Sequence, residues 1–151
     1  MNSAESNTFS YAADAARARW TAHVDGSREA AVCVVSGEAA ADAVRSALNA
    51  SFERLGYGAG ACTFVALDAG GEALSPADAY TLLESFDPLV LVAADATATR
   101  ALAQIYRTPL APGKPARLLG RGAVAFTDFA ADLADPAAKR RAWTALKHLA
   151  R

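Results

Sequence analysis

Short, continuous apolar runs alternate with longer amphipathic segments along most of this chain of 151 residues. The four clearest runs are residues 31–35, 62–67, 89–92 and 122–126. Runs of this length are typical of strands that are buried on both faces. The segments between them repeat their apolar residues every three or four positions, as amphipathic helices do. Strands joined through helices run parallel, so the sequence predicts an α/β fold, a three-layer α/β/α sandwich around a four-stranded, mostly parallel sheet.

Helices are expected over residues 8–24, 39–55, 76–86 and 136–150, and a further one ends near Tyr106. The clearest helix start has Ser75 as N-cap, Pro76 in the first turn and Asp78 three residues after the cap. Asp95 or Thr97 is expected to cap the helix that ends near Tyr106.

The length fits one domain, which we expect to span residues 8–151 behind a disordered segment, residues 1–7. That segment has neither the basic nor the apolar stretch of a signal peptide. No run approaches the ~20 apolar residues that a membrane-spanning helix needs. Cys33 and Cys62 lie in apolar runs and are expected to be buried free thiols. Residues 107–118 hold three prolines and are the expected long loop. These features favour a cytoplasmic protein without membrane contact.

Charge is distributed unevenly along the chain. Residues 1–100 carry 6 basic and 13 acidic side chains, whereas residues 101–151 carry 9 basic and 3 acidic ones. The basic part either faces phosphates or an acidic partner, or folds against the acidic part of the same chain. Lys139, Arg140 and Arg141 lie close to an aromatic residue, Trp143, and are candidate nucleic-acid contacts. The alternative is a solvated helix face with a core tryptophan.

Ligands of such folds bind at the carboxyl ends of the parallel strands. The candidate pocket rim at these ends consists of Gly37, Glu38, Asp68, Asp95, Asp128 and Phe129. Its acids have three possible roles, because carboxylates can hold a divalent cation, act as a general base or cap helix N-termini.

No motif selects a catalytic role for this rim. The chain has no GxGxxG, no GxxxxGK[ST] and no GxSxG sequence. His23 and His148 are expected near helix C-termini and away from the strand ends, which leaves the rim without the usual acid–base residue. The sequence therefore predicts no confident catalytic residue, no metal site and no cofactor.

Several segments share their order with a known superfamily. They are residues 37–40 (GEAA), 85–92 (SFDPLVLV), 97–102 (TATRAL), 118–122 (LLGRG) and 139–147 (KRRAWTALK). This order resembles the uracil-DNA glycosylase superfamily, especially its compact bacterial and archaeal branches. The first segment resembles the family's GExPG motif, whose acid, at the position of Glu38, helps to activate water. The last resembles the family's terminal helix, in which basic residues precede a tryptophan.

The chain also departs from that family's chemistry. Ala40 replaces the motif proline, and the loop with the uracil-stacking aromatic is missing because a helix follows directly. The family's histidine motif falls on residues 127–131, which contain no histidine, and the four cysteines of the iron–sulfur branch are absent. Hydrolysis at a flipped base needs a stacking pocket and a positioned acid or histidine. The resemblance therefore implies a glycosylase-like fold without glycosylase activity.

Three functions follow as alternatives. The first is a non-catalytic glycosylase-like domain whose basic last third contacts nucleic acid or a replication or repair protein. A bacterial polymerase clamp-loader accessory subunit with this fold is a precedent for such an adaptor. The second is a small-molecule or metal-dependent enzyme that uses Glu38, Asp68, Asp95 and Asp128. The third is a generic doubly wound binding or scaffold domain. A basic stripe beside the strand ends would favour the first, and carboxylates within metal-ligand reach of one another would favour the second. Carboxylates that cap backbone amides, with no cleft, would favour the third.

Overall fold

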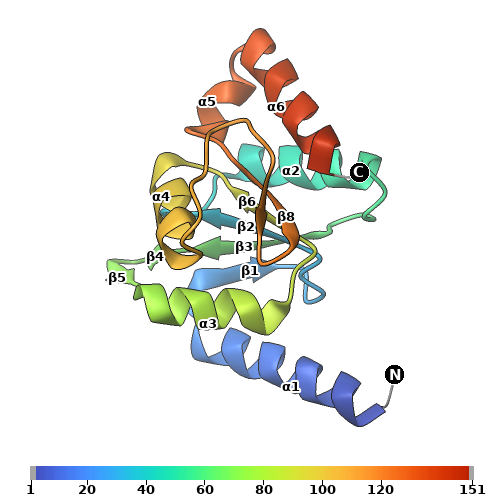
Figure 1. Ribbon diagram of the computed structural model, residues 1–151, viewed down its shortest axis with the longest axis vertical. Helices are drawn as coiled ribbons and strands as arrows, with labels where there is room; N and C mark the ends of the chain where they lie inside the picture. The colour runs from blue at the N-terminus through green and yellow to red at the C-terminus, as the bar shows by residue number, and fades with distance from the viewer. Residues whose placement is uncertain (1–2, 150–151) are drawn as a thin grey trace.

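A computed structural model describes residues 3–149 and has the expected α/β class (Figure 1). Its main sheet has six strands in the order β1-β3-β2-β6-β8-β7. The strands in this order are β1 (Val24–Gly26), β3 (Cys62–Ala66), β2 (Val32–Ser36), β6 (Val90–Ala93), β8 (Arg121–Ala125) and β7 (Ala116–Leu118). The four central strands are the expected ones and run parallel to one another.

The two edge strands make the sheet mixed, with six strands where four were expected. β1 pairs antiparallel with β3, and β7 pairs antiparallel with β8. Each edge strand has only three residues, too few for a periodic signal. β7 comes from the end of the expected loop 107–118. It joins β8 through Leu119 and Gly120, which both have positive φ values, as a tight hairpin turn requires.

The first helix ends earlier than expected. α1 spans Ser3–Arg19, a 3₁₀ turn covers Thr21–His23, and the chain then enters β1. The prediction of a helix over 8–24 was therefore wrong at its C-terminal end, because it relied on the helical spacing of Trp20 and Val24. Trp20 leaves the helical conformation (φ −115°, ψ 40°), and the β-branched Val24 is extended and pairs with Val65. Because α1 begins at Ser3, it includes residues that were expected to be disordered; residues 1–2 lie outside the described residues.

Helices cover both faces of the sheet (Figure 1). One face carries α2 (Asp42–Arg54), α5 (Phe129–Leu133) and α6 (Pro136–Leu149). The other carries α3 (Pro76–Phe86) and α4 (Ala96–Ile105), with α1 along the outer side of α3. Strand β2 illustrates the double burial: Val32 and Val34 pack toward α2, whereas Cys33 and Val35 pack toward α3 and α4.

The start of α3 follows the predicted pattern. The Ser75 hydroxyl oxygen accepts a hydrogen bond from the Asp78 amide at 3.1 Å, and Pro76 opens the helix. Two features were not expected. A small hairpin, β4 (Asp68–Ala69) and β5 (Glu72–Ala73), replaces a simple turn, and the short helix α5 precedes α6. None of the helices within residues 3–149 has the length and apolar character needed to cross a membrane.

Candidate functional site

The chain order of the parallel strands places a topological switch point between β2 and β6, because β3 lies on one side of β2 and β6 on the other. Ligands of doubly wound folds bind in the crevice outside such a point. Here the chain fills it. The Gly37 amide donates to Asp95 Oδ2 at 2.9 Å, and the Ala98 amide donates to Asp95 Oδ1 at 2.8 Å. A Cβ atom at Gly37 would lie 3.0 Å from Thr97 Cβ, so the β2–α2 loop packs closely against α4 at this point.

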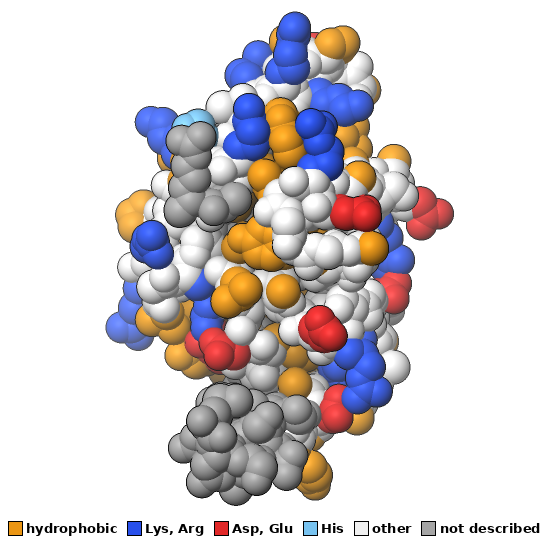
Figure 2. Space-filling view, turned by 90° about the vertical axis from the view of Figure 1, so that its right-hand side faces the viewer, with side chains coloured by type: hydrophobic (Ala, Val, Ile, Leu, Met, Phe, Trp, Pro, Cys, Tyr) orange, Lys and Arg blue, Asp and Glu red, His pale blue; other side chains and the backbone are white. Residues whose placement is uncertain are grey.

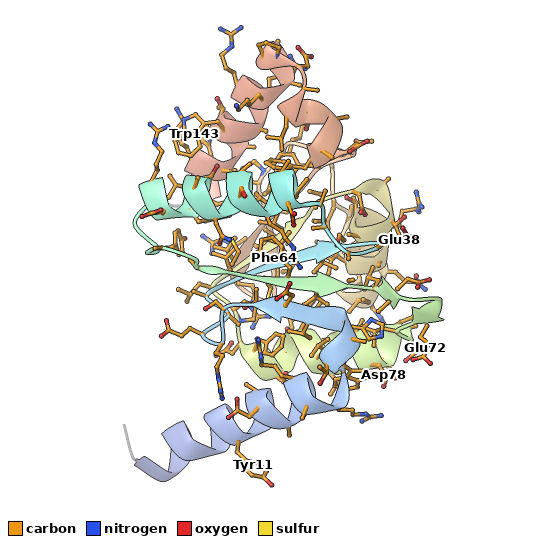
Figure 3. All side chains as sticks on the ribbon, turned by 180° about the vertical axis from the view of Figure 1, so that it is seen from behind. Tyr11, Glu38, Phe64, Glu72, Asp78 and Trp143 are labelled. Atoms are coloured by element: carbon orange, nitrogen blue, oxygen red, sulfur yellow. The ribbon has the colours of Figure 1, made fainter. Side chains whose placement is uncertain are left out.

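Other rim acids also bind the backbone. Asp128 caps α5 by accepting from the Ala131 amide at 3.1 Å. Asp68 accepts from the Gly71 amide at 2.9 Å and stabilises the β4–β5 turn. Glu38 follows the central strand β2 and is exposed at the carboxyl ends of the parallel strands (Figure 3). Three of the four rim carboxylates are therefore caps or turn acceptors, as the third sequence hypothesis expected.

The rim residues form two groups and not one centre: Glu38 and Asp68 border a hollow of about 450 Å³ at the strand ends, whereas Asp95 and Asp128 pair through their backbones and cap α4 and α5. Phe129 is buried, with 3% of its surface exposed, and its ring centroid is 5.1 Å from that of Phe126, so it is a core residue and not a pocket wall. Within the described part of the chain, no group of three His, Cys, Asp or Glu side chains is placed to hold a metal ion. The geometry required by a metal-dependent rim enzyme is thus missing from those residues.

The prediction that the histidines lie away from the strand ends is wrong for His23. His23 is 7% exposed, and its Nδ1 lies 2.7 Å from the carbonyl oxygen of Ala66, the last residue of β3. With Ser36 it lines a cavity of only about 40 Å³. The Ser36 hydroxyl donates to the Glu38 carbonyl oxygen at 2.5 Å. The side chains of His23 and Ser36 are therefore both hydrogen-bonded to backbone carbonyl groups. Sequence reasoning missed this position because it extended the first helix through His23.

A wide hollow lies on the outer side of the α5–α6 region. It is a groove of about 730 Å³ between α6, the residues that follow β8, and the proline-rich loop, which we call the loop groove. The Gly113 amide donates to the Ala125 carbonyl oxygen at 2.8 Å and fixes the loop against the end of β8. The basic residues of the lining are Lys114, Arg140, Arg141 and His148.

Polar and apolar groups share this loop groove. Phe126 and Ala142 are buried and form part of its floor, whereas Thr127 is exposed beside them. His148 lines the groove from the last turn of α6, near the helix C-terminus as expected. The acidic member of the lining is Asp132, whose pKa is raised by burial and, to a smaller extent, by the negative charge of Asp128.

A second hollow lies on the other flank of α6. Its volume is about 260 Å³, and α2, α5 and α6 form its walls; we call it the Trp143 hollow. Trp143 is half-buried there, so it is not the fully enclosed core tryptophan of the alternative interpretation. The Arg54 guanidinium carbon lies 4.8 Å from the Trp143 ring centroid, and Lys147 Nζ lies 5.8 Å from it. Both cations are within the range of a cation–π interaction.

Helix geometry explains why the two hollows flank one ridge. Ala138, Ala142, Ala145 and Leu146 form the buried face of α6. Arg140 and Lys147 are seven residues apart and therefore share the opposite, exposed face. Lys139 faces the Trp143 hollow and Arg141 the loop groove. The three predicted contact residues are thus spread over both flanks and the crest of a single helix.

Part of the basic last third does fold against the acidic part of the chain. Arg121 pairs with Glu84 and with Asp87, the latter at 3.0 Å. The ion pairs within the described residues involve Arg28, Arg45 and Arg121, and none involves a lysine or arginine of α6. Figure 2 shows Lys and Arg side chains gathered over the upper part of the molecule, where α5 and α6 lie.

Two residues of this surface escaped the sequence analysis: Arg54 and Lys114. Arg54 is in the last turn of α2, and Lys114 lies in a proline-rich loop. Only the three-dimensional arrangement brings them beside α6, because each comes from a different segment. Their basic character was visible, but no spacing rule connected them.

Comparisons with known proteins add no family. No model of a protein family matches the chain, and no curated protein matches it.

Proposed function

We propose that this domain binds nucleic acid through the outer surface of α6 and carries out no glycosylase reaction. The observation that carries the proposal is a group of basic residues that border two hollows on the flanks of α6. We call it the α6 basic surface; its members are Arg54, Lys114, Lys139, Arg140, Arg141 and Lys147. Phosphate contacts from lysine and arginine supply most of the affinity of nucleic-acid binding.

The location of the charge supports a role in binding. The lysines and arginines of α6 are exposed, and the described residues form no ion pair with them. No close ion pair therefore holds these charges, although Arg141 lies near enough to Asp132 for the two charges to interact. The apolar floor of the loop groove adds a surface against which sugars or bases can pack.

The closed switch point supports the non-catalytic half of the proposal. A base flipped for hydrolysis needs a pocket with a positioned acid. The Gly37–Asp95 hydrogen bond and the contact with Thr97 occupy the corresponding place. We propose that the chain is a glycosylase-like domain whose chemistry has been lost, acting in the cytoplasm as a nucleic-acid-binding or repair and replication adaptor.

Fluorescence anisotropy with short uracil-containing DNA, single- and double-stranded, tests the proposal. Arg140→Gln/Arg141→Gln should weaken binding, and the slope of log affinity against log salt should fall by ~0.7 for each lost contact to a single strand. Arg19→Gln/Arg28→Gln removes the same charge on and beside α1, at the other end of the molecule, and should leave affinity unchanged within about two-fold, since exposed charges are screened over ~10 Å.

A strand-cleavage assay after alkaline treatment completes the test, with no excision of uracil expected. Absence of binding by the native protein at low salt would overturn the nucleic-acid proposal. Equal losses in the α6 variant and in the control variant would show that total charge, not this surface, determines binding. Uracil excision would refute the non-catalytic assignment.

A further inference from the structure

We infer that the α6 basic surface recognises single-stranded nucleic acid, with a base stacked in the Trp143 hollow and the backbone crossing the α6 crest. This inference rests on the proposed function and specifies the ligand of the same surface. It starts from the position of Trp143, which is half-buried in a hollow with apolar walls and is flanked by cations from two helices.

The lining of the Trp143 hollow suits a nucleobase. Ala47, Ala50 and Leu133 supply small apolar walls, so a flat ring can lie beside the indole. The Arg54 guanidinium lies over the indole ring, so a base stacks either on the outer face of the guanidinium or on the indole after Arg54 moves to the phosphate. Aromatic rings with adjacent cations are how sequence-tolerant single-strand binders hold successive bases.

The crest and the loop groove continue this path. Arg140 and Lys147 project from the exposed face of α6, between the two hollows. Phosphates that cross the helix therefore meet cations at its crest. On the far flank, Arg141 and Lys114 border the loop groove, whose floor includes the buried Phe126. Bases on either side of the crest thus reach an apolar surface.

A duplex fits this surface poorly. Its bases are paired and stacked inside, so a half-buried tryptophan cannot reach their faces without flipping. A helix of ~10–12 Å diameter fills the major groove, ~12 Å wide, when its flanks are free. The flanks of α6 are occupied by α2 and α5 on one side and by the proline-rich loop on the other. Insertion of α6 into a major groove would therefore bring these walls against the duplex backbone, whereas a single strand can follow the two hollows.

The test uses the full chain with fluorescein-labelled oligothymidylate and oligouridylate of about 12 nucleotides, within the ~4–16 range of single-strand sites, and a hairpin duplex of equal charge. Trp143→Ala should weaken single-strand binding by about 5- to 150-fold, the effect of losing one base–aromatic stack. Trp143→Phe should retain part of the affinity, because a smaller ring still stacks. Tyr11→Ala is the matched control: Tyr11 is 79% exposed on α1, at the opposite end of the molecule (Figure 3).

Intrinsic fluorescence gives an independent measurement that does not depend on Trp143→Ala being folded. The chain has two tryptophans, and Trp20 is buried beneath α1 on the other face of the sheet. Single strands should quench the emission of the native protein but not that of Trp143→Phe. If DNA and RNA strands quench the emission equally, the protein recognises base and phosphate alone. If one of them quenches more strongly, the sugar is an additional contact. Either result supports the inference.

The outcomes separate the inference from the proposed function. The stacking inference would be overturned if single strands left the emission unquenched and Trp143→Phe and Trp143→Ala bound with unchanged affinity. The proposed function would still hold if Arg140→Gln/Arg141→Gln lost binding in the same experiment. Tighter binding of the duplex than of either single strand would also overturn the stacking inference. Failure of the native protein to bind any oligonucleotide at low salt would overturn both.

Discussion

At the scale of single residues, Gly37 shows how closely the strand-end region is packed. Its amide is used by Asp95, and its Cα lies so near α4 that an added methyl group would meet Thr97. The GEAA segment was singled out in the sequence as a catalytic resemblance. In the structure it serves the packing of the β2–α2 loop against the start of α4.

Gly37→Ala is expected to lower the free energy of unfolding by ~1–3 kcal/mol, the usual cost of overpacking a close contact. Because the contact is with the Thr97 side chain, Thr97→Gly in the same chain should recover part of this loss. Urea denaturation of the two single variants and the double variant measures the coupling. Oligonucleotide binding by folded Gly37→Ala should be unchanged, and a large loss of affinity would place the nucleic-acid site at the strand ends instead of at α6.

At the scale of elements, one polar cluster connects α3, α4 and β8. The Tyr106 hydroxyl donates to Glu84 Oε2 at 2.7 Å, and Arg121 pairs with the same carboxylate oxygen. Burial is the main reason that the pKa of Tyr106 is raised above its ordinary value, and the hydrogen bond to Glu84 adds to it. The cluster lies on the opposite face from α6, so it bears on stability and not on the proposed site.

The raised pKa of Tyr106 predicts a loss of stability in alkali. A tyrosine whose pKa is higher in the folded state than in the unfolded state, ~10, contributes fully below that pH, and the contribution is lost as the pH rises above it. Tyr106→Phe should be ~1.5–3 kcal/mol less stable at neutral pH, because a hydrogen bond to a charged group is lost. The difference from the native protein should then narrow above pH ~10, as urea titrations at several pH values would show.

Cys33 and Cys62 also make the free energy of unfolding depend on pH, but they do not affect the difference between the two proteins. Burial raises the pKa of each thiol to about 12, so both also destabilise the fold at high pH. They are present in the native protein and in Tyr106→Phe alike, and their effect cancels in the difference. A gap between the two proteins that stays constant up to pH ~12 would contradict the assigned role of Tyr106.

The same scale explains which parts of the fold were predictable. The central strands and α3 have strong local signals, namely uninterrupted apolar runs and the Ser75-Pro76 start. The edge strands do not, since β1 is fixed by pairing of Val24 with Val65, a residue distant in the chain. Only this long-range contact distinguishes a strand at 24–26 from the end of the first helix. The position of His23 was missed for the same reason.

The candidate site was predictable in part. Lys139, Arg140 and Arg141 were recognisable because they are adjacent in the sequence and lie near Trp143. The hollows themselves were not, because Arg54 and the loop around Lys114 come from separate segments. The rim acids could be placed at the strand ends, but whether they faced a ligand or a backbone amide depended on distances that a sequence does not contain.

At the scale of the whole molecule, the charges are segregated although their sum is only −1. Glu72 and Asp78 lie near β5 and the start of α3, at a distance from Trp143 on α6 (Figure 3). We call the region of these two acids the acidic end. Screening limits the reach of exposed charges to ~8 Å at physiological salt and to ~30 Å at 0.01 M. The acidic end should therefore affect a polyanion at α6 only when salt is very low.

Glu72→Gln/Asp78→Asn tests whether local or total charge attracts the nucleic acid. The double variant raises the net charge by two units, yet its affinity for oligothymidylate should match that of the native protein within about two-fold at ~0.15 M salt. At ~0.01 M salt a modest gain is expected, because the repulsion from the acidic end then reaches α6. Anisotropy titrations at both salt concentrations measure the two effects. A large gain at ~0.15 M would mean that net charge drives association, whereas a gain confined to low salt assigns binding to the α6 basic surface.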